Sequence, residues 1–123
     1  DACRNSPGSI TPKVTNVLTV GSISEDDTMS DFTSYGNCVN IFAPGDGVPV
    51  FKAHDHEANI LGVGTSFSAP LTAGVVAIYL SQRVYTKAGD VVRDVINNSS
   101  PLSAYHERIG RAGIVYAFPN LPR

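Results

Sequence analysis

The stretch GVGTSFSAPLTAGVVAIYL, residues 62–80, decides how the rest of the chain is interpreted. Almost every position in residues 67–80 is apolar or small, and a helix that is apolar on all sides is usually a buried one. Thr65 or Ser66 can cap this helix, because a hydroxyl side chain accepts from the free N–H groups of a first turn. Pro70 falls early, where its missing N–H matters least. The pattern predicts a buried helix with Ser66 at its N-terminus.

Ser66 has two interpretations. Position alone favours a plain N-cap, since many helices begin with serine or threonine. Gly62 and Gly64, however, allow the backbone to approach another group closely just before the serine. The helix N-terminus also places partial positive charge and free N–H groups beside the Ser66 hydroxyl, where an oxyanion would form. The stretch is not the G-x-S-x-G nucleophile elbow, because Ser68 stands where that motif has glycine.

On both sides of this helix the chain alternates short apolar runs with turn residues. Runs rich in valine and threonine predict strands, and a charged tip between two apolar runs predicts a hairpin. The expected elements are a strand over 14–20 stopped by Gly21, a short strand over 39–42, hairpin arms over 48–51 and 59–63, a second helix over 87–96 capped by Thr86, and a last apolar segment over 114–118. Strands at the front and helices behind favour an α/β fold.

Composition limits the classes of function. The chain has 123 residues, of which 42% are apolar and 16% charged, as in an ordinary globular domain. The net charge is −2 and no basic stripe is visible, so a nucleic-acid partner has little support. The longest apolar run is about 15 residues and is too short to span a bilayer comfortably, which argues against a membrane protein.

Three segments together resemble one known family. GTSFSAPLTAG (residues 64–74) fits the active-site serine pattern G-T-S-x-[SA]-x-P-x-x-[AG] of subtilisin-like serine proteases, the subtilases of peptidase family S8. DACRNSP with the later VLTVG (within residues 1–21) and FTSYGNCVNIFAPG (residues 32–45) are similar to two further family segments, in the family's order. The resemblance covers essentially residues 1–118 and is nearest to the proteinase K-like branch of secreted enzymes.

The resemblance implies a three-layer α/β fold with a mostly parallel sheet, of which residues 1–123 would form the C-terminal part. Ser66 would be the nucleophile of a Ser-His-Asp endopeptidase, and its backbone N–H, supported by Gly64 and Thr65, would donate to the oxyanion. The family's aspartate, histidine and oxyanion asparagine segments do not occur in this chain. The chain alone is therefore expected to be inactive.

The expected partners follow from the same resemblance. They are a protein or peptide substrate, the upstream part of the same catalytic domain, and an inhibitory prosegment as a further candidate. An alternative from another class is a pseudoprotease or binding module that keeps the fold and the serine pattern without turnover. Intact upstream aspartate, histidine and asparagine would favour the enzyme, and loss of any of them would favour the alternative.

Cys3 and Cys38 are the two cysteines, and their spacing alone supports two free buried thiols at least as well as it supports a disulfide. Relatives with this cysteine pattern bridge the two, so the resemblance implies a Cys3–Cys38 disulfide. It also implies a secreted or vacuolar location, because disulfides persist in oxidising compartments. Asn97 and Asn98 each begin an N-x-S glycosylation pattern, which is common by chance.

No cofactor is required by the implied mechanism, but the family often has a structural calcium site. Carried over, its ligands would be the Thr15 and Val17 carbonyls and the side chain of Asn40. Asparagine supplies an oxygen without the charge that strengthens calcium binding. A second candidate, the run HDHE (residues 54–57), holds metal-capable groups at a hairpin tip, where adjacent residues rarely converge on zinc, so a solvated loop is expected.

Three further positions depart from the family pattern or could be mistaken for catalytic groups. His106 is outside any catalytic context and is expected to be a surface histidine. Leu71 stands where the family usually has histidine behind the serine, which marks a divergent member. Asn5 stands where proteinase K-like enzymes have tyrosine beside the specificity pocket, which puts the substrate preference in doubt.

Overall fold

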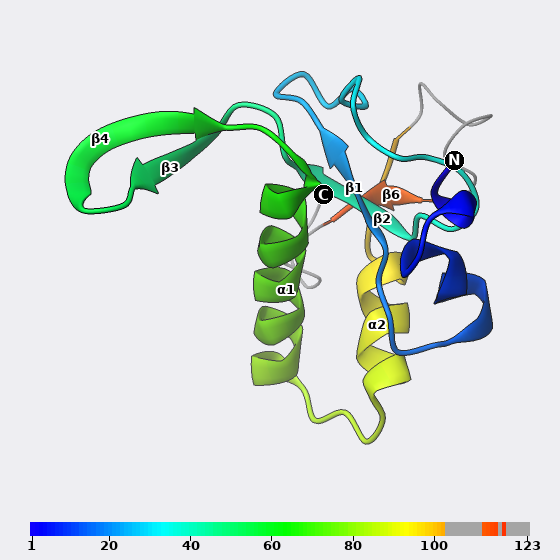
Figure 1. Cartoon of the computed structure of the whole chain (residues 1–123). Helices are drawn as coiled ribbons and strands as arrows, with labels where there is room; N and C mark the ends of the chain where they lie inside the picture. The colour runs from blue at the N-terminus through cyan, green and yellow to red at the C-terminus, as the bar shows by residue number, and fades with distance from the viewer. Residues whose placement is uncertain (103–111, 116, 118–123) are drawn as a thin grey trace.

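The computed structural model describes residues 1–102, 112–115 and 117, and within these the side chains of residues 55–59 are not described. Figure 1 shows the arrangement of the elements. In chain order they are the 3₁₀ helices η1 (Ala2–Arg4) and η2 (Gly8–Lys13), strands β1 (Val20–Ile23), β2 (Ile41–Pro44), β3 (Val48–Lys52) and β4 (Asp55–Gly62), helices α1 (Thr65–Gln82) and α2 (Ala88–Asn97), and strands β5 (Ser100–Pro101) and β6 (Gly113–Ile114).

The main sheet confirms the α/β class. Its strand order is β1-β2-β6-β5, with β1, β2 and β6 parallel and only β5 antiparallel. Parallel strands need crossover connections, and α1 and α2 lie in the stretch that joins β2 to β6. Both helices lie on the same side of the sheet (Figure 1).

Strand β2 divides the core into two clusters because successive side chains point to opposite faces. Ile41 is fully buried against Tyr79 of α1 and Val95 of α2. Phe42, the next residue, is fully buried on the other face, where it packs with Ile23. The helices therefore cover one face of the sheet, and the N-terminal segment contributes to the other.

The expected disulfide between Cys3 and Cys38 is present, with 5.2 Å between the Cα atoms. Cys38 is buried in the same cluster as Phe42, whereas Cys3 is exposed at the start of the chain. Ala2 N–H also donates to the Tyr35 carbonyl at 2.8 Å. These contacts hold the N-terminal segment against the loop that precedes β2.

The predicted strand over 14–20 is wrong. The strand is Val20–Ile23, and it runs through Gly21 instead of stopping there. The reason is packing: a Cβ at position 21 would overlap the Phe42 ring of the neighbouring strand. Glycine here permits a close approach between strands rather than a turn. The next strand is likewise displaced, to Ile41–Pro44 from the predicted 39–42.

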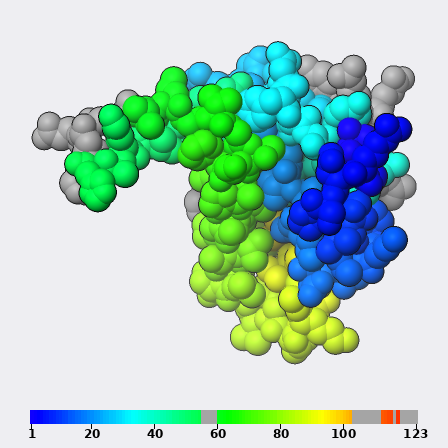
Figure 2. All heavy atoms as spheres, in the orientation of Figure 1, coloured from blue at the N-terminus to red at the C-terminus, as the bar shows by residue number. Residues whose placement is uncertain are grey.

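The predicted hairpin is confirmed as an antiparallel pair of β3 and β4 with an irregularity between Phe51 and Lys52. It pairs with no other strand of the described chain and extends as an arm from the body (Figures 1 and 2). Large apolar side chains on this arm are exposed: Phe51 is 69% exposed and Leu61 is 70% exposed.

Helix α1 is not buried all round, contrary to the prediction. Ser68, Thr72 and Tyr79 are buried, but Leu71 and Leu80 on the other side are 44% and 51% exposed. The sheet and α2 cover one face, and no described element covers the other. No helix among the described residues is long and apolar enough to cross a membrane.

The start of α1 also differs from the prediction. Gly64 is the N-cap, with φ +139°, and no side chain caps the helix, so Ser66 is the second helical residue and not the cap. Pro70 is the sixth helical residue and so lies in the second turn. A proline there removes the N–H that would bond the Ser66 carbonyl four residues earlier.

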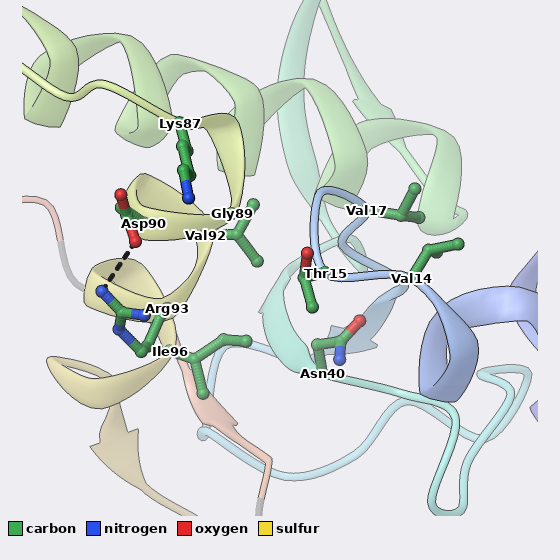
Figure 3. Close-up of a pocket in the computed structure, with 10 residues that line it drawn as sticks. All are labelled: Val14, Thr15, Val17, Asn40, Lys87, Gly89, Asp90, Val92, Arg93 and Ile96. Carbon is green, nitrogen blue, oxygen red and sulfur yellow. Dashed lines mark hydrogen bonds and ion pairs between the residues drawn. The ribbon is translucent and has the colours of Figure 1, made fainter.

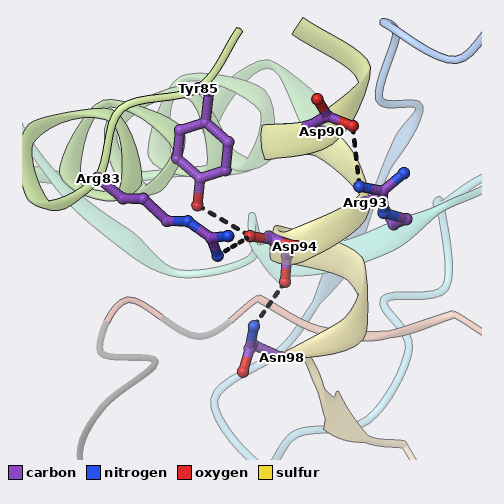
Figure 4. Close-up of polar contacts among 6 residues, drawn as sticks. All are labelled: Arg83, Tyr85, Asp90, Arg93, Asp94 and Asn98. Carbon is purple, nitrogen blue, oxygen red and sulfur yellow. Dashed lines mark hydrogen bonds and ion pairs between the residues drawn. The ribbon is translucent and has the colours of Figure 1, made fainter. Parts of the chain in front are cut away.

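Helix α2 is amphipathic and buries Val91 and Val95. It begins at Ala88 after Lys87, one residue later than the predicted start after Thr86. Figure 4 shows the polar contacts that join it to the end of α1: Arg83 pairs with Asp94 at 3.0 Å, and the Tyr85 hydroxyl donates to the same carboxylate at 3.1 Å. Because these side chains are partly exposed, the contacts fix geometry more than they add stability.

Candidate active site

Ser66 is an exposed residue at the N-terminus of α1. Thr65 is the first helical residue and is half-buried, and Phe67 N–H closes the first turn on the Gly64 carbonyl at 3.0 Å. The first N–H groups of a helix have no intrahelical partner and carry partial positive charge. Ser66 thus combines an accessible hydroxyl with a backbone donor in a site that favours negative charge.

The loop before Ser66 is fixed to the sheet through two backbone bonds. Gly64 N–H donates to the Gly45 carbonyl at 2.7 Å, and Gly45 N–H donates to the Ile23 carbonyl at 3.1 Å. Ile23 ends β1 and Gly45 directly follows β2, so both lie at the carboxyl ends of parallel strands. Open α/β sheets place their functional sites at this edge.

Glycine at position 45 permits a tight contact beneath the candidate site. A Cβ there would overlap the Ser68 hydroxyl and lie 2.5 Å from Ser22 Oγ and 2.9 Å from the Gly64 carbonyl. Ser68 is fully buried, and its Oγ has no hydrogen-bond partner among the described residues. The sequence gives no local signal for this contact, because it joins Gly45 to a residue 23 positions later in the chain.

Gly62 and Gly64 have separate roles, and only Gly62 shows the predicted close approach of the backbone to another group. A Cβ at position 62 would lie 2.5 Å from the Phe67 ring, so the ring packs directly over the Gly62 backbone. Gly64 has φ +139°, a conformation that L side chains rarely adopt. The two glycines let the chain turn sharply from β4 into α1.

No histidine is placed beside Ser66 by the described residues. His54 lies at the hairpin tip with φ +64°, and the eight residues of β4 separate it from the start of α1, roughly 26 Å of extended chain. The side chains of residues 55–57 are not described, and His106 lies outside the described residues. The described residues hold a candidate nucleophile and a candidate oxyanion donor, and they place no histidine beside either.

The candidate calcium ligands line a hollow of about 500 Å³ between the segment before β1 and α2 (Figure 3). Thr15, Val17 and Asn40 all border it. Lys87 and Arg93 border it too, and Figure 3 shows the Lys87 ammonium directed into the space.

The donor chemistry of this hollow disfavours a divalent cation. Asn40 Oδ1 already accepts the Thr19 N–H at 2.7 Å, and Asp90 is paired with Arg93 at 2.8 Å. Two cationic side chains at the rim would repel calcium, which binds best to several anionic oxygens. The described residues contain no group of three histidine, cysteine or acidic side chains placed for a metal. Calcium binding remains a prediction, and no catalytic step depends on it.

The two glycosylation candidates differ in accessibility. Asn97 ends α2 and is exposed. The Asn98 side-chain amide donates to the Asp94 carbonyl at 2.8 Å, so it is partly engaged in closing the helix. Of the two departures from the family pattern, Asn5 is exposed beside η1, and Leu71 lies on the exposed face of α1.

Comparisons with known proteins agree with this geometry. The model of the subtilase family matches residues 2–117. The "Alkaline extracellular protease" of Yarrowia lipolytica is 36% identical over 86 residues, which are 66% of this chain and 19% of that protein. The "Alkaline serine exoprotease A" of Vibrio alginolyticus is 33% identical over 101 residues, which are 81% of this chain and 18% of that protein.

A solved structure shows the same arrangement. The chain superposes on a cold-adapted subtilisin-like serine proteinase with a TM-score of 0.70 and 27% identity, over 94% of this chain and 39% of that one. The chain thus spans about a fifth of the length of the curated relatives named above. The family match over nearly the whole chain, together with this shared fold, shows that the chain belongs to the subtilase family.

Proposed function

We propose that the protein containing this chain is a serine endopeptidase and that Ser66 is its nucleophile. The observation that carries the proposal is the exposed Ser66 at the N-terminus of α1, behind a glycine with φ +139° and at the carboxyl edge of a parallel sheet. Membership of a family whose relatives are named as proteases supports it.

In the proposed reaction, Ser66 Oγ attacks the carbonyl carbon of a peptide bond while its proton passes to a histidine. The tetrahedral oxyanion accepts a hydrogen bond from the Ser66 N–H, supported by the turn at Gly64 and Thr65. The C–N bond then breaks, the histidine proton goes to the leaving amine, and an acyl-enzyme remains. Water hydrolyses the acyl-enzyme and restores the serine.

The histidine, its aspartate and the oxyanion asparagine come from an upstream part of the same catalytic domain in this proposal. The exposed apolar face of α1, which includes Leu71 and Leu80, supports it, because large apolar side chains on a helix normally pack against another element. The 123 residues would then be the C-terminal part of that domain. A peptide is the substrate, and an inhibitory prosegment is a further proposed partner.

A secreted or vacuolar location is part of the same proposal. The Cys3–Cys38 disulfide supports it, because such bonds persist in oxidising compartments. The relative from Yarrowia lipolytica is named as an extracellular protease, which agrees with that location.

The test is covalent labelling of the intact protein by a fluorophosphonate probe. Ser66→Ala is expected to abolish both labelling and peptide hydrolysis, whereas Ser81→Ala, at an exposed serine of the same helix, is expected to leave both at wild-type level. Wild-type labelling in the Ser66 variant would refute the nucleophile assignment.

A folded wild-type protein that neither labels nor hydrolyses peptides would favour the inactive binding module instead. The 123-residue chain by itself is expected to remain unlabelled, because its described residues place no histidine beside Ser66. Restoring labelling by adding the upstream part in trans would support the division of the domain proposed above.

A further inference from the structure

A second hollow, of about 490 Å³, lies beside the candidate active site. Its wall includes four acidic residues, Glu25, Asp26, Asp31 and Asp46, and three apolar ones, Met29, Phe32 and Val63. We call it the acidic hollow. None of its described lining residues is basic.

The acidic hollow is built onto the loop that positions Ser66. Val63 precedes Ser66 by three residues, a span of at most about 11 Å. Asp46 directly follows Gly45, whose carbonyl holds the Gly64 N–H at 2.7 Å. The Ser24 hydroxyl, which also borders the hollow, donates to Asp46 Oδ2 at 2.9 Å and holds that carboxylate in place. The hollow and the candidate nucleophile therefore share one rigid backbone connection.

The carboxylates of the acidic hollow do not converge as a metal site. The described residues contain no group of three acidic, histidine or cysteine side chains placed for a metal ion. The Thr28 hydroxyl and N–H both donate to Asp26 Oδ1, and these hydrogen bonds hold the pKa of Asp26 below its ordinary value. Negative charge that is spread around a roomy space suits a long cationic side chain better than a compact ion.

The apolar walls fit the rest of such a side chain. Phe32 and Val63 are both exposed large apolar residues on this surface. Lysine and arginine carry aliphatic stems that pack on apolar surface while the charged end reaches a polar region. An aromatic face such as that of Phe32 also attracts a cation placed over it.

We propose that the acidic hollow binds a lysine or arginine side chain of the peptide substrate. The proposal rests on the proposed function, because it places the scissile bond at Ser66. An extended peptide advances about 3.3 Å per residue, so a hollow within about 11 Å of Ser66 is reached two or three residues from that bond. The protein is thus an endopeptidase that prefers substrates with a basic residue at this distance from the cleaved bond.

The test is cleavage profiling of the intact protein with a peptide library in which each position within three residues of the cleaved bond is varied. The peptides that the wild-type protein cleaves are expected to be enriched in lysine or arginine at one such position. Asp31→Asn is the first variant, because Asp31 is exposed and makes no side-chain hydrogen bond or ion pair with another described residue that the change would break. Its expected effect is a roughly threefold loss of kcat/KM for the basic peptide, with neutral peptides unaffected.

Asp46→Asn keeps an oxygen for Ser24 and removes only the charge, so the double variant with Asp31→Asn is expected to lose roughly tenfold on basic peptides. Asp27→Asn is the matched control: it lies in the same loop, does not line the hollow, and has φ +60°, which asparagine tolerates well. It is expected to match wild type on both peptides.

Fluorophosphonate labelling of Ser66 separates the two proposals. Two results would refute the proposed role of the acidic hollow and leave the proposed function standing. One is normal labelling without a preference for basic peptides. The other is normal labelling with Asp27→Asn losing as much kcat/KM on the basic peptide as Asp31→Asn does. Absence of labelling in the folded wild type would overturn both. A basic preference that weakens with added salt, as expected for exposed charges, would support the hollow.

Discussion

The Cα atom of Gly45 faces the buried hydroxyl of Ser68 so closely that a Cβ at position 45 would overlap it. This contact joins the end of β2 to the first turn of α1, at a residue two positions after Ser66. The same Gly45 holds Gly64 through its carbonyl and Ile23 through its N–H. The position of the candidate nucleophile therefore depends on a glycine that is distant from it in sequence.

Gly45→Ala is expected to destabilise the intact protein by about 1–3 kcal/mol, because the added methyl group overpacks a space already filled by Ser68 and Ser22. It is also expected to slow labelling of Ser66, because the displaced Gly45 carbonyl anchors Gly64. Urea denaturation measures the first effect and the rate of fluorophosphonate labelling measures the second.

The control for this prediction is a double-variant cycle with Ser68→Ala. The Ser68 hydroxyl is buried without a partner among the described residues, so its removal alone is expected to change stability by less than about 1 kcal/mol. In the double variant, Ser68→Ala is expected to restore part of the stability that Gly45→Ala removes. Strict additivity of the two changes would show that the residues are not in contact.

Asn40 and Thr19 exchange two hydrogen bonds: Thr19 N–H donates to Asn40 Oδ1 at 2.7 Å, and Asn40 N–H donates to the Thr19 carbonyl at 2.9 Å. Asn40→Ala removes the first acceptor at a partly buried site. The expected cost is about 1–2 kcal/mol in the free energy of unfolding, measured by urea denaturation. Asn37→Ala, at an exposed asparagine of the same loop, should be close to neutral, and an equal loss there would refute a specific role for Asn40.

The calcium prediction is tested at the same position by charge. Asn40→Asp keeps the acceptor for Thr19 and adds the negative charge that calcium binding favours. Calcium is expected to raise the thermal midpoint of the variant more than that of wild type, compared in each case with the metal-free protein. Equal midpoints with calcium and with chelator in both proteins would rule out binding at Thr15, Val17 and Asn40.

The Cys3–Cys38 disulfide closes a loop with a sequence separation of 35 residues. On the chain-entropy model, a loop of this size contributes about 3–4 kcal/mol by restricting the unfolded chain. Cys3→Ala together with Cys38→Ala is expected to lose that amount in denaturant unfolding, and reductant should have little further effect on the variant. A wild-type protein whose stability is unchanged by full reduction would contradict this expectation.

Elements that depend on a local pattern of apolar and polar residues could be predicted from the sequence. The hairpin was predictable because two apolar runs flank a charged tip, and α1 because its apolar run is long and continuous. The Cys3–Cys38 pairing and the mostly parallel sheet followed from the family resemblance rather than from composition. Ser66 at a helix N-terminus was predictable, although it is the second helical residue and Gly64 is the cap.

Features that depend on contacts between distant segments could not be predicted. Gly21 reads as a strand terminator, but the Phe42 ring makes glycine necessary inside the strand. The sequence predicts more burial for α1 than the structure shows. An apolar pattern indicates that the side chains of a helix favour burial, but it does not indicate whether another element covers them. The acidic hollow combines loop residues with Asp46 and Val63, whose proximity only the fold creates.

Tyr85 provides a prediction on pH. Burial raises the pKa of the Tyr85 phenol, and the hydrogen bond to Asp94 and the charge of that carboxylate raise it further. A group whose pKa is higher in the folded state contributes stability that is present below its unfolded pKa, about 10 for tyrosine, and is lost as the pH rises through the folded value. The intact protein is therefore expected to lose stability above about pH 10 more steeply than Tyr85→Phe does.

Alkaline titration of phenolate absorbance, taken as the difference between wild type and Tyr85→Phe, isolates this one tyrosine. Asp94→Asn removes the neighbouring charge and should lower the midpoint only part of the way to the ordinary value, because burial is the largest cause of the raised pKa. A return of the Tyr85 midpoint to its ordinary value in Asp94→Asn would show that Asp94, and not burial, is the main cause of the raised pKa. A Tyr85 midpoint at the ordinary value in wild type would mean that the contact between Tyr85 and Asp94, and with it the docking of α2 to the end of α1, does not persist in solution.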